Sequence, residues 1–542
     1  MLSKRRLLSF AAGVALVAGA SFGAAPASAQ QTLRWAFQGN LNTLDPYGIN
    51  ETTTLGLQGN VYEGLTKRGK DLKIIPGLAE RWEVLDNGLR WRFYLRKGVK
   101  FHNGNDFNAD DVVFSAQRVV ANNSQLTSRL SGGPEFIKVD DFTVDVKLKS
   151  PNPILHYAWD TWYIMDKEWT EANNAQIPPA PQATTPGFAT INANGTGPFR
   201  ITEHQLGVRT VFEKNANWWG KPEHNLDRVI FTPITSAPTR VAALLSGEVD
   251  VIDPVPLQDV PRINASANAR VLEGPEVRTI YLSFDQMRPE LTASSVKGKN
   301  PFKDVRVRKA FYQAIDIEAI RRQVMRGAAV PAASLISPLF FPQIEQIKRH
   351  PFDLAAANKL MDEAGYPRTG ADNIRFEVDF DCPNDRYVND GPICQAVTAM
   401  LARIGVKINL QAVPRAAFFA KINSPIYNTP FYLLGWTPGT GDAHNVLIDL
   451  MHTRTADGSG GRGQFNNGGY SNARVDALTA QVLVEIDTAK RDAMILEAFT
   501  ILHNEVGYIP LHQQALAWGV AKSVELTQRA DNQPLFYWVQ KK

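Results

Sequence analysis

Residues 374–412 read IRFEVDFDCPNDRYVNDGPICQAVTAMLARIGVKINLQA, and their pattern decides the fold class. Apolar and polar residues alternate over 374–380 and again over 406–410, which is typical of strands. Between them, an apolar stripe predicts a helix over 388–404 that ends at Gly405. A strand, a helix and a strand at this spacing indicate a crossover unit whose two strands run parallel. The stretch therefore predicts an α/β fold.

The rest of the chain adds further helices and an antiparallel region. Residues 91–101 and 142–148 alternate as half-exposed strands do, and a capped helix is predicted between them over 108–120. A loop rich in Pro, Ala, Asn and Thr over 171–198 is typical of a domain border. Further helices are predicted over 239–245, over 353–364 and, as a pair, over 474–505. The sequence thus predicts several α/β lobes with antiparallel strands near the N-terminus.

The N-terminus has the three parts of an export signal. Lys4-Arg5-Arg6 precede an apolar run over 7–20, and small residues follow at Ala27-Ser28-Ala29. The run is shorter than the roughly 20 residues that span a bilayer, although a retained membrane anchor is the alternative. We expect cleavage after Ala29, a periplasmic location, and no lipid anchor, because no Cys lies near the junction.

Composition and charge narrow the class of protein. The chain has 542 residues, 44% hydrophobic and 21% charged, which predicts a globular protein of three or four folding units. Residues 1–29 hold three cations and no acid, so 55 of the 58 Lys and Arg face 54 acids elsewhere, a net charge of +1. Such a body lacks the broad positive field that holds nucleic acid, and we expect no nucleic-acid partner.

The cysteines and the missing motifs indicate binding rather than catalysis. Cys382 and Cys394 are the only two cysteines, and an oxidising compartment favours a disulfide between them over two free thiols. We expect no metal site, since no further soft ligands lie nearby. The hydrolase and P-loop signatures are absent, and the G-x-G-x-x-G letters at 458–463 lack a strand before them and a helix after them. We therefore expect no catalytic residues and no cofactor, with an exported hydrolase as the remaining enzymatic alternative.

A Gly- and Pro-containing loop after the apolar strand 431–435 is the first candidate ligand site. It reads WTPGTGDAHN over 436–445, and an aromatic ring, an acid and amides at a strand end are typical of a ligand rim. For Asp442 a second interpretation stays open, in which its carboxylate caps a helix over 446–451. The candidate ligand residues in this loop are Trp436, Thr437, Gly439, Asp442, His444 and Asn445.

Arg386 and Tyr387 form a second candidate, between a predicted strand end and a predicted helix start. The Arg386 guanidinium could bind a ligand carboxylate through two parallel hydrogen bonds. The alternative is a salt bridge to Asp381 or Asp390.

Several segments together resemble one family. They are Tyr62-Glu-Gly-Leu-Thr, Pro76-Gly-Leu-Ala-Glu-Arg-Trp, Gly195-Thr-Gly-Pro-Phe, Asn215-Ala-Asn-Trp-Trp-Gly-Lys-Pro, Ala243-Leu-Leu-Ser-Gly-Glu-Val-Asp-Val and Pro301-Phe-Lys-Asp-Val-Arg-Val-Arg-Lys-Ala. In this order and spacing the chain resembles the family 5 extracytoplasmic solute-binding proteins of ABC importers, the dipeptide, oligopeptide and nickel-binding type.

The resemblance implies a type II periplasmic-binding-protein fold, a Venus-flytrap that delivers its ligand to permease subunits in the inner membrane. It divides the chain into a signal peptide, two α/β lobes and an additional β-rich domain. The implied ranges are 1–29 for the signal peptide, 30–60 plus 190–275 plus 506–542 for lobe I, 61–189 for the β-rich domain, and 276–505 for lobe II. The expected protein is a monomer and not an enzyme.

The resemblance leaves the ligand partly open. Dipeptide binders of this family read G-W-T-G-D in the loop, and the Asp receives the peptide amine. This chain has Pro438 and Gly439 after Gly435-Trp436-Thr437, so that Asp is missing. Arg386 roughly matches the position that binds the peptide carboxylate. A small peptide or peptide-like solute is the implied ligand, with a nickel chelate, haem, an opine or an oligosaccharide as alternatives.

Overall fold

The computed structural model describes residues 30–542 except 131, 180–184, 385, 423–425 and 455–461. The predicted export signal and most of the Gly-rich letters at 458–463 therefore lie outside the described residues.

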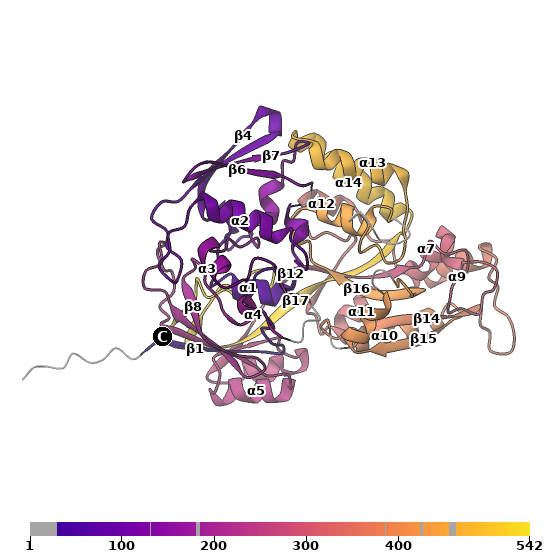
Figure 1. Cartoon of the computed structure of the whole chain (residues 1–542). Helices are drawn as coiled ribbons and strands as arrows, with labels where there is room; N and C mark the ends of the chain where they lie inside the picture. Colours follow the sequence, from indigo (N-terminus) through magenta and orange to yellow (C-terminus); the bar gives the residue numbers. More distant parts are fainter. Residues whose placement is uncertain (1–29, 131, 180–184, 385, 423–425, 455–461) are drawn as a thin grey trace, which may run out of the picture.

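Eleven strands of the described residues form one mixed sheet that runs through the molecule (Figure 1). Its order is β15-β14-β16-β12-β17-β11-β1-β10-β9-β8, and β13 pairs with β17 beside this path. The strands are β1 (Thr32–Phe37), β8 (Phe199–Gln205), β9 (Arg209–Lys214), β10 (Arg228–Pro233), β11 (Val251–Asp253), β12 (Ala269–Phe284), β13 (Ala329–Pro331), β14 (Phe376–Pro383), β15 (Val406–Val413), β16 (Phe431–Trp436) and β17 (Tyr508–Ala521).

The two longest strands, β12 and β17, join the two halves of this sheet. They pair antiparallel along their length, and the register shifts between Pro275 and Thr279 of β12. Beyond Thr279, β12 also pairs with β16, while the other end of β17 pairs with β11. The lobe II strands are thus attached at one end of this ribbon and the lobe I strands at the other. The irregular segment 276–278 lies in β12 between the part that pairs with β17 alone and the part that also pairs with β16.

The crossover unit predicted from residues 374–412 is confirmed. β14 and β15 pair in parallel from Phe376 opposite Val406 to Pro383 opposite Val413. The helix between them, α10, begins at Asp390, two residues later than predicted, because Asn389 takes a left-handed backbone conformation. Gly405 has a φ of +77°, the left-handed conformation in which Gly carries no Cβ penalty.

The predicted antiparallel region is a four-stranded sheet of order β4-β5-β7-β6. β5 ends at Leu95, earlier than the predicted 101, because Gly98 turns the chain with a φ of +73°. Helix α2 lies against this sheet, and Asn108 and Asp111 close its N-terminus as a capping box. The bounds are β4 (Ala79–Leu85), β5 (Arg90–Leu95), β6 (Glu135–Asp140), β7 (Thr143–Lys147) and α2 (Ala109–Val119).

The remaining helices agree with the sequence pattern where it made a prediction. The predicted helices over 239–245 and 353–364 are α5 and α9, and the pair over 474–505 is α13 and α14. Bounds are α1 (Thr52–Gln58), α3 (Lys167–Ala172), α4 (Phe188–Ile191), α5 (Ala237–Ser246), α6 (Val260–Asn264), α7 (Val305–Ala314), α8 (Ile317–Ala319), α9 (Leu354–Glu363), α10 (Asp390–Ala402), α11 (Arg415–Ile422), α12 (Ala443–Val446), α13 (Ala473–Val484) and α14 (Thr488–Asn504). Among the described residues, no helix has both the length and the apolar character that a membrane span requires.

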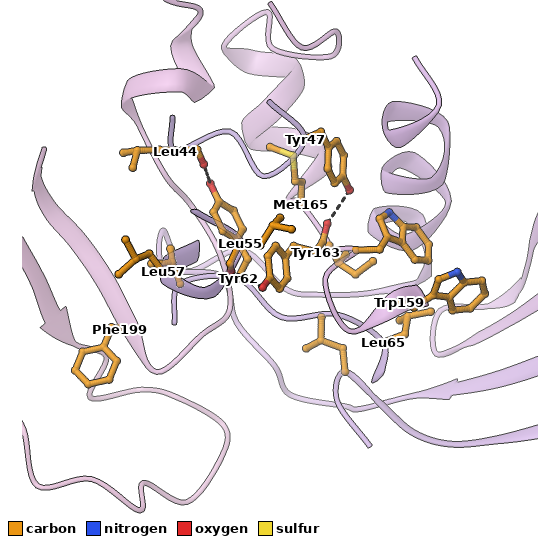
Figure 2. Close-up of a cluster of buried hydrophobic side chains, with 14 of the residues drawn as sticks. Leu44, Tyr47, Leu55, Leu57, Tyr62, Leu65, Trp159, Tyr163, Met165 and Phe199 are labelled. Atoms are coloured by element: carbon orange, nitrogen blue, oxygen red, sulfur yellow. Dashed lines mark hydrogen bonds between the residues drawn. The ribbon is translucent and has the colours of Figure 1, made fainter. Parts of the chain in front are cut away.

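Aromatic side chains with satisfied hydroxyl groups fill the core shared by lobe I and the β-rich domain (Figure 2). The Tyr47 hydroxyl donates to Tyr163 O at 2.7 Å, and the Tyr62 hydroxyl donates to Leu44 O at 3.2 Å. Because buried polar groups cost free energy unless they are hydrogen-bonded, these contacts let the large rings pack without a penalty.

Candidate functional site

The irregular segment of β12 carries a buried ion pair at the crossing of the sheet. Arg278 Nε donates to Glu276 Oε1 at 3.0 Å, and the two residues are 7% and 1% exposed. Gln514 of β17 donates from Nε2 to Glu276 Oε2 at 2.7 Å. Both β12 and β17 therefore hold this carboxylate in place. Buried charges persist only when they are paired and hydrogen-bonded, as here.

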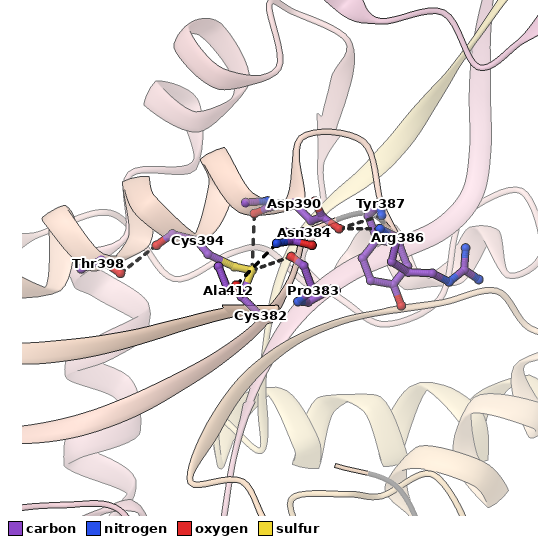
Figure 3. Close-up of a disulfide and its surroundings, with 10 residues drawn as sticks. Cys382, Pro383, Asn384, Arg386, Tyr387, Asp390, Cys394, Thr398 and Ala412 are labelled. Carbon is purple, nitrogen blue, oxygen red and sulfur yellow. Dashed lines mark hydrogen bonds between the residues drawn. A yellow bond between two sulfur atoms is a disulfide. The ribbon is translucent and has the colours of Figure 1, made fainter. Parts of the chain in front are cut away.

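The loop that carries Arg386 and Tyr387 is held at both ends (Figure 3). The structure joins Cys382, at the end of β14, to Cys394 in α10 by a disulfide with Cα atoms 6.5 Å apart. Asp390 Oδ2 accepts from the backbone N–H groups of Arg386 and Tyr387, both at 2.9 Å. The backbone of the loop is therefore tied down at the position of its two candidate residues.

The Arg386 guanidinium itself has no carboxylate partner among the described residues. Of the two alternatives raised by the sequence, Asp381 pairs with Lys421 at 2.6 Å, and Asp390 accepts from the Arg386 backbone rather than its side chain. The guanidinium lies 5.1 Å from the centre of the Tyr387 ring. Burial, and then the neighbouring Arg278, lower the pKa of Arg386. The negative charge of an anionic ligand would oppose both effects, because an opposite charge nearby stabilises the charged guanidinium.

Tyr387 brings Arg386, Arg278 and the Trp436 loop together. The Arg278 guanidinium lies 5.9 Å from the Tyr387 ring, and the Tyr387 hydroxyl donates to Gly435 O at 3.3 Å. A Cβ on Gly435 would lie 2.8 Å from that ring, so Gly permits the close approach. We call Glu276, Arg278, Arg386, Tyr387 and Gln514 the hinge site.

Within the Trp436 loop, Asn445 is the organising side chain. Its Oδ1 accepts from Trp436 Nε1 at 3.0 Å and from Gly439 N at 3.2 Å, and its Nδ2 donates to Asp449 at 2.7 Å. The half-buried Trp436 ring packs against Phe465, with centroids 5.0 Å apart. Asn445 therefore fixes the indole and the loop backbone. Both acceptor directions of the amide oxygen and one of the two amide N–H groups are thus engaged within the loop.

Asp442 and His444 take structural roles in this conformation. Asp442 caps α12 by accepting from His444 N at 2.7 Å, and its two oxygens accept from Arg491 at 2.7 and 3.0 Å. His444 is 6% exposed, and burial lowers its pKa to about 4. The Thr437 hydroxyl is buried without a hydrogen bond to any described residue. The capping interpretation of Asp442 is thus the one that the contacts support, with the helix beginning at Ala443 instead of 446.

The same loop reaches across to the β-rich domain. Arg68 Nη2 donates to Thr440 O at 2.6 Å, and a Cβ on Gly439 would lie 3.7 Å from Arg129 Nη1. Burial raises the pKa of Asp449 to about 7, and the facing Arg129 opposes that shift. Lobe II therefore meets the β-rich domain through polar groups.

Sequence reasoning missed Glu276, Arg278 and Gln514. Glu276 and Arg278 could have been noticed in the sequence. They are two opposite charges directly before the largely apolar stretch TIYLSF of residues 279–284, and buried charges need partners. For Gln514 and for the contact partners Arg68 and Arg129, no local pattern marks the residue, because their roles depend on elements distant in the chain.

One group of carboxylates in the described residues, Asp111, Asp166 and Glu168, is close enough to share a cation. Asp166 Oδ2 already accepts from the side-chain amides of Asn103, Asn105 and Asn194 at 2.8–2.9 Å. Asp111 accepts from two backbone N–H groups near helix starts. These oxygens serve to cap helices and hold loops, and we assign no metal to them.

Comparison with known proteins gives one family and one fold. Residues 73–458 match the model of the bacterial extracellular solute-binding proteins, family 5. The chain is 29% identical to "Heme-binding protein A" of Haemophilus influenzae over 81% of this chain and 78% of the relative. It is 27% identical to the glutathione-binding protein GsiB of Salmonella choleraesuis over 94% of each.

A solved structure agrees in fold along the same length. The periplasmic binding protein DppA of Helicobacter pylori, in complex with the peptide STSA, superposes with a TM-score of 0.77. The match is 22% identical and covers 94% of this chain and 98% of the other. The two-lobed arrangement joined by β12 and β17 is therefore shared with a ligand-bound member of that fold.

Proposed function

Because the chain belongs to the family 5 extracellular solute-binding proteins and has their type II periplasmic-binding fold, we propose that it captures a small peptide or peptide-like solute with a free carboxylate. The solute is held between the two lobes and is delivered unchanged to the permease subunits of an ABC importer. The protein does no chemistry on it.

Arg386 is the observation that carries the proposal. Its half-buried guanidinium lies at the hinge site with no carboxylate partner in the described structure, while its neighbour Arg278 is already paired with Glu276. A ligand carboxylate would supply the missing counter-charge through charge-assisted hydrogen bonds, which are the strong ones. The charge of Glu51, in the segment proposed as lobe I, raises the pKa of Arg386, so residues of both proposed lobes act on this guanidinium.

Closure of the lobes makes this contact selective. A ligand shifts a protein toward the closed state only by as much as it binds that state better than the open one. The rings of Tyr387 and Trp436 would pack against the body of such a ligand. The loop backbone at Thr437 and Gly439 would lie close to the ligand, because neither residue has a large side chain. Asp442, His444 and Asn445 support the loop and are not among the proposed contacts.

Haem is a second candidate, because a relative at 29% identity carries that name. Its two carboxylates could use the same Arg386 position, so the charge argument does not separate the two ligands. Their size does, since haem needs a wide apolar site that a small peptide does not.

We further propose that the signal peptide is removed after Ala29 and that the mature chain is a periplasmic monomer without a lipid anchor. The division into lobe I, the β-rich domain and lobe II keeps the ranges given above. The boundary between residues 275 and 276 falls in β12 at the start of the irregular segment. β12 and β17 are then shared between the lobes, with residues 276–278 as the hinge.

Calorimetric titration tests the proposal directly. The purified mature chain is titrated with glutathione, with di- to pentapeptides, with the same peptides as C-terminal amides, and with haemin. We expect a free-acid peptide to bind, its amide to bind roughly 100-fold more weakly, and Arg386→Met to remove that difference, since losing a buried charged contact costs about 3 kcal/mol.

Arg322→Met is the matched control, because Arg322 is exposed and makes only a 3.9 Å contact to Glu318. This variant should bind as the wild type does. Binding of free acids that Arg386→Met leaves unchanged, or no heat with any peptide, would overturn the peptide proposal; haemin binding alone would favour the second candidate.

A further inference from the structure

A second pocket of about 250 Å³ lies away from the hinge site. Its described lining residues come from the β-rich domain, from the loop around Trp218–Glu223 and from the C-terminal tail around Arg529–Trp538. None of them belongs to residues 276–505 of lobe II. No residue of the hinge site lines this pocket, and it approaches the Trp436 loop only through Arg68, which donates to Thr440 O.

Aromatic rings surround one ammonium group in this pocket. Lys67 Nζ lies 5.8 Å from the Trp218 ring centre, 5.6 Å from that of Trp219 and 5.5 Å from that of Tyr537. The Arg96 guanidinium lies 4.5 Å from the Trp219 ring. Cation–π attraction holds the two cations against the walls but supplies no hydrogen-bond acceptor to their N–H groups.

The cations of this pocket exceed the carboxylates that could neutralise them. Among the described residues, neither Lys67 nor Arg96 makes a salt bridge, while Asp160 and Glu223 are engaged by Arg68 and Lys70 respectively. The pocket therefore presents two cations that make no salt bridge to a carboxylate of the described residues.

Glu63 lines the same pocket but makes no salt bridge to Lys67 or Arg96. It is 3% exposed, and its Oε2 accepts from Trp219 Nε1 at 2.7 Å and from Thr196 Oγ1 at 3.0 Å. Burial raises the pKa of Glu63, and the nearby Lys67 opposes that shift. Its Oε1 is buried with no hydrogen-bond partner among the described residues. Glu63 therefore offers an unused polar atom at the wall of the pocket.

We propose that this pocket is a second binding site, for a small carboxylic acid that carries a ring. The carboxylate would accept from Lys67 and Arg96, and the ring would stack on Trp218 and Tyr537. Glu63 Oε1 would accept a hydrogen bond from a polar substituent of the ring. Flat aromatic rings and the C–H faces of sugar rings both stack on such walls.

Titration with phenylacetate and with glucuronate distinguishes the two ring types, and phenylacetamide is the neutral control. Calorimetry and tryptophan fluorescence are followed in parallel. We expect at least one acid to bind in roughly the millimolar range or tighter, with the amide at least tenfold weaker. Phenylacetate alone assigns an aromatic acid and glucuronate alone a sugar acid.

Substitutions test whether the acid binds in this pocket. Lys67→Met and Trp218→Leu should each weaken the acid at least tenfold, while Lys67→Arg retains most of the affinity. Lys407→Met, an exposed lysine paired with Glu377 in lobe II, and Arg386→Met should leave it unchanged. Circular dichroism checks that each variant is folded.

Three outcomes measured on the acids and the pocket variants overturn the proposal, and a fourth comes from Arg386→Met. The first three are no binding of either acid, equal affinity for acid and amide, and binding that survives both pocket variants. Loss of binding in Arg386→Met also overturns it, because the acid then occupies the hinge site. Peptide binding at the hinge site is measured separately, so either proposal can fail alone.

Discussion

Replacing Asp442 with Asn tests whether this carboxylate serves the fold or the ligand. Asp442 accepts hydrogen bonds from the two terminal nitrogens, Nη1 and Nη2, of Arg491. The side chains of Asp442 and Arg491 are 9% and 11% exposed. It also caps α12 through His444 N. Because Asn is as good a helix cap as Asp, the substitution keeps the cap and removes the charge.

The expected loss of unfolding free energy is about 3–5 kcal/mol, since Arg491 is left buried without a counter-charge. A matched exposed pair joins α14 to the neighbouring helix α13. Arg474 bonds Glu497 through two hydrogen bonds of 2.7 and 2.9 Å, with side chains 52% and 43% exposed. Glu497→Gln should cost less than about 1 kcal/mol, because water screens and replaces that contact. The difference between the two variants isolates the effect of burial.

Urea unfolding of the mature chain, followed by fluorescence and circular dichroism, measures both losses. Adding Arg491→Met to Asp442→Asn should recover part of the stability, because no unpaired charge then remains buried. Equal unfolding midpoints for Asp442→Asn and Glu497→Gln would refute this reasoning. A loss of ligand affinity of more than about tenfold under folding conditions would make Asp442 a ligand contact after all.

Three further substitutions test other parts of the account. Cys382 and Cys394 are twelve positions apart, so replacing both with Ser should lower the unfolding free energy by about 3 kcal/mol through loop entropy; an unchanged urea midpoint argues against it. Burial lowers the pKa of His512 to about 4, and both its ring nitrogens lack partners in the described structure. In the unfolded chain His512 binds a proton once the pH falls below about 6.5, whereas in the folded chain it stays neutral down to about pH 4. The free energy of unfolding therefore falls as the pH falls from about 6.5 toward 4. Between pH 6.5 and 4.5, the free energy of unfolding of His512→Leu should fall by about 2–3 kcal/mol less than that of the wild type. If the two proteins lose the same stability over this pH range, His512 is not the titrating group. Gly435→Ala would place a Cβ 2.7 Å from Ile280, and the expected cost of about 1–3 kcal/mol is checked by its thermal midpoint, which should fall.

Local pattern predicted the elements of the fold well where the periodicity was strong. The parallel pair β14 and β15 and the helices α9, α13 and α14 follow from apolar spacing and from Asp or Gly residues at their ends. The end of β5 at Leu95 was harder, because alternation continues past the point where Gly98 turns the chain. The alternation of apolar and polar residues indicates which face of a strand is buried. It does not indicate where the backbone hydrogen bonds of that strand end.

The candidate site was predictable in part. Arg386 and Trp436 stand out because a charge and a ring follow strand ends, where sheets place ligand sites. For Asp442 the sequence left a ligand contact and a helix cap open, because its partner Arg491 lies 49 positions away and no local pattern shows that the carboxylate is engaged. The ion pair of Glu276 and Arg278 becomes meaningful only when β17 brings Gln514 beside it.

Native mass spectrometry of the mature chain, purified from the periplasm without unfolding, tests the central claim most directly. We predict one small carboxylate-bearing molecule per chain in the wild type and in Lys67→Met, and loss of that molecule in Arg386→Met. The same adduct in both proteins, or a bound molecule without any carboxyl group, would contradict capture of a carboxylate at Arg386.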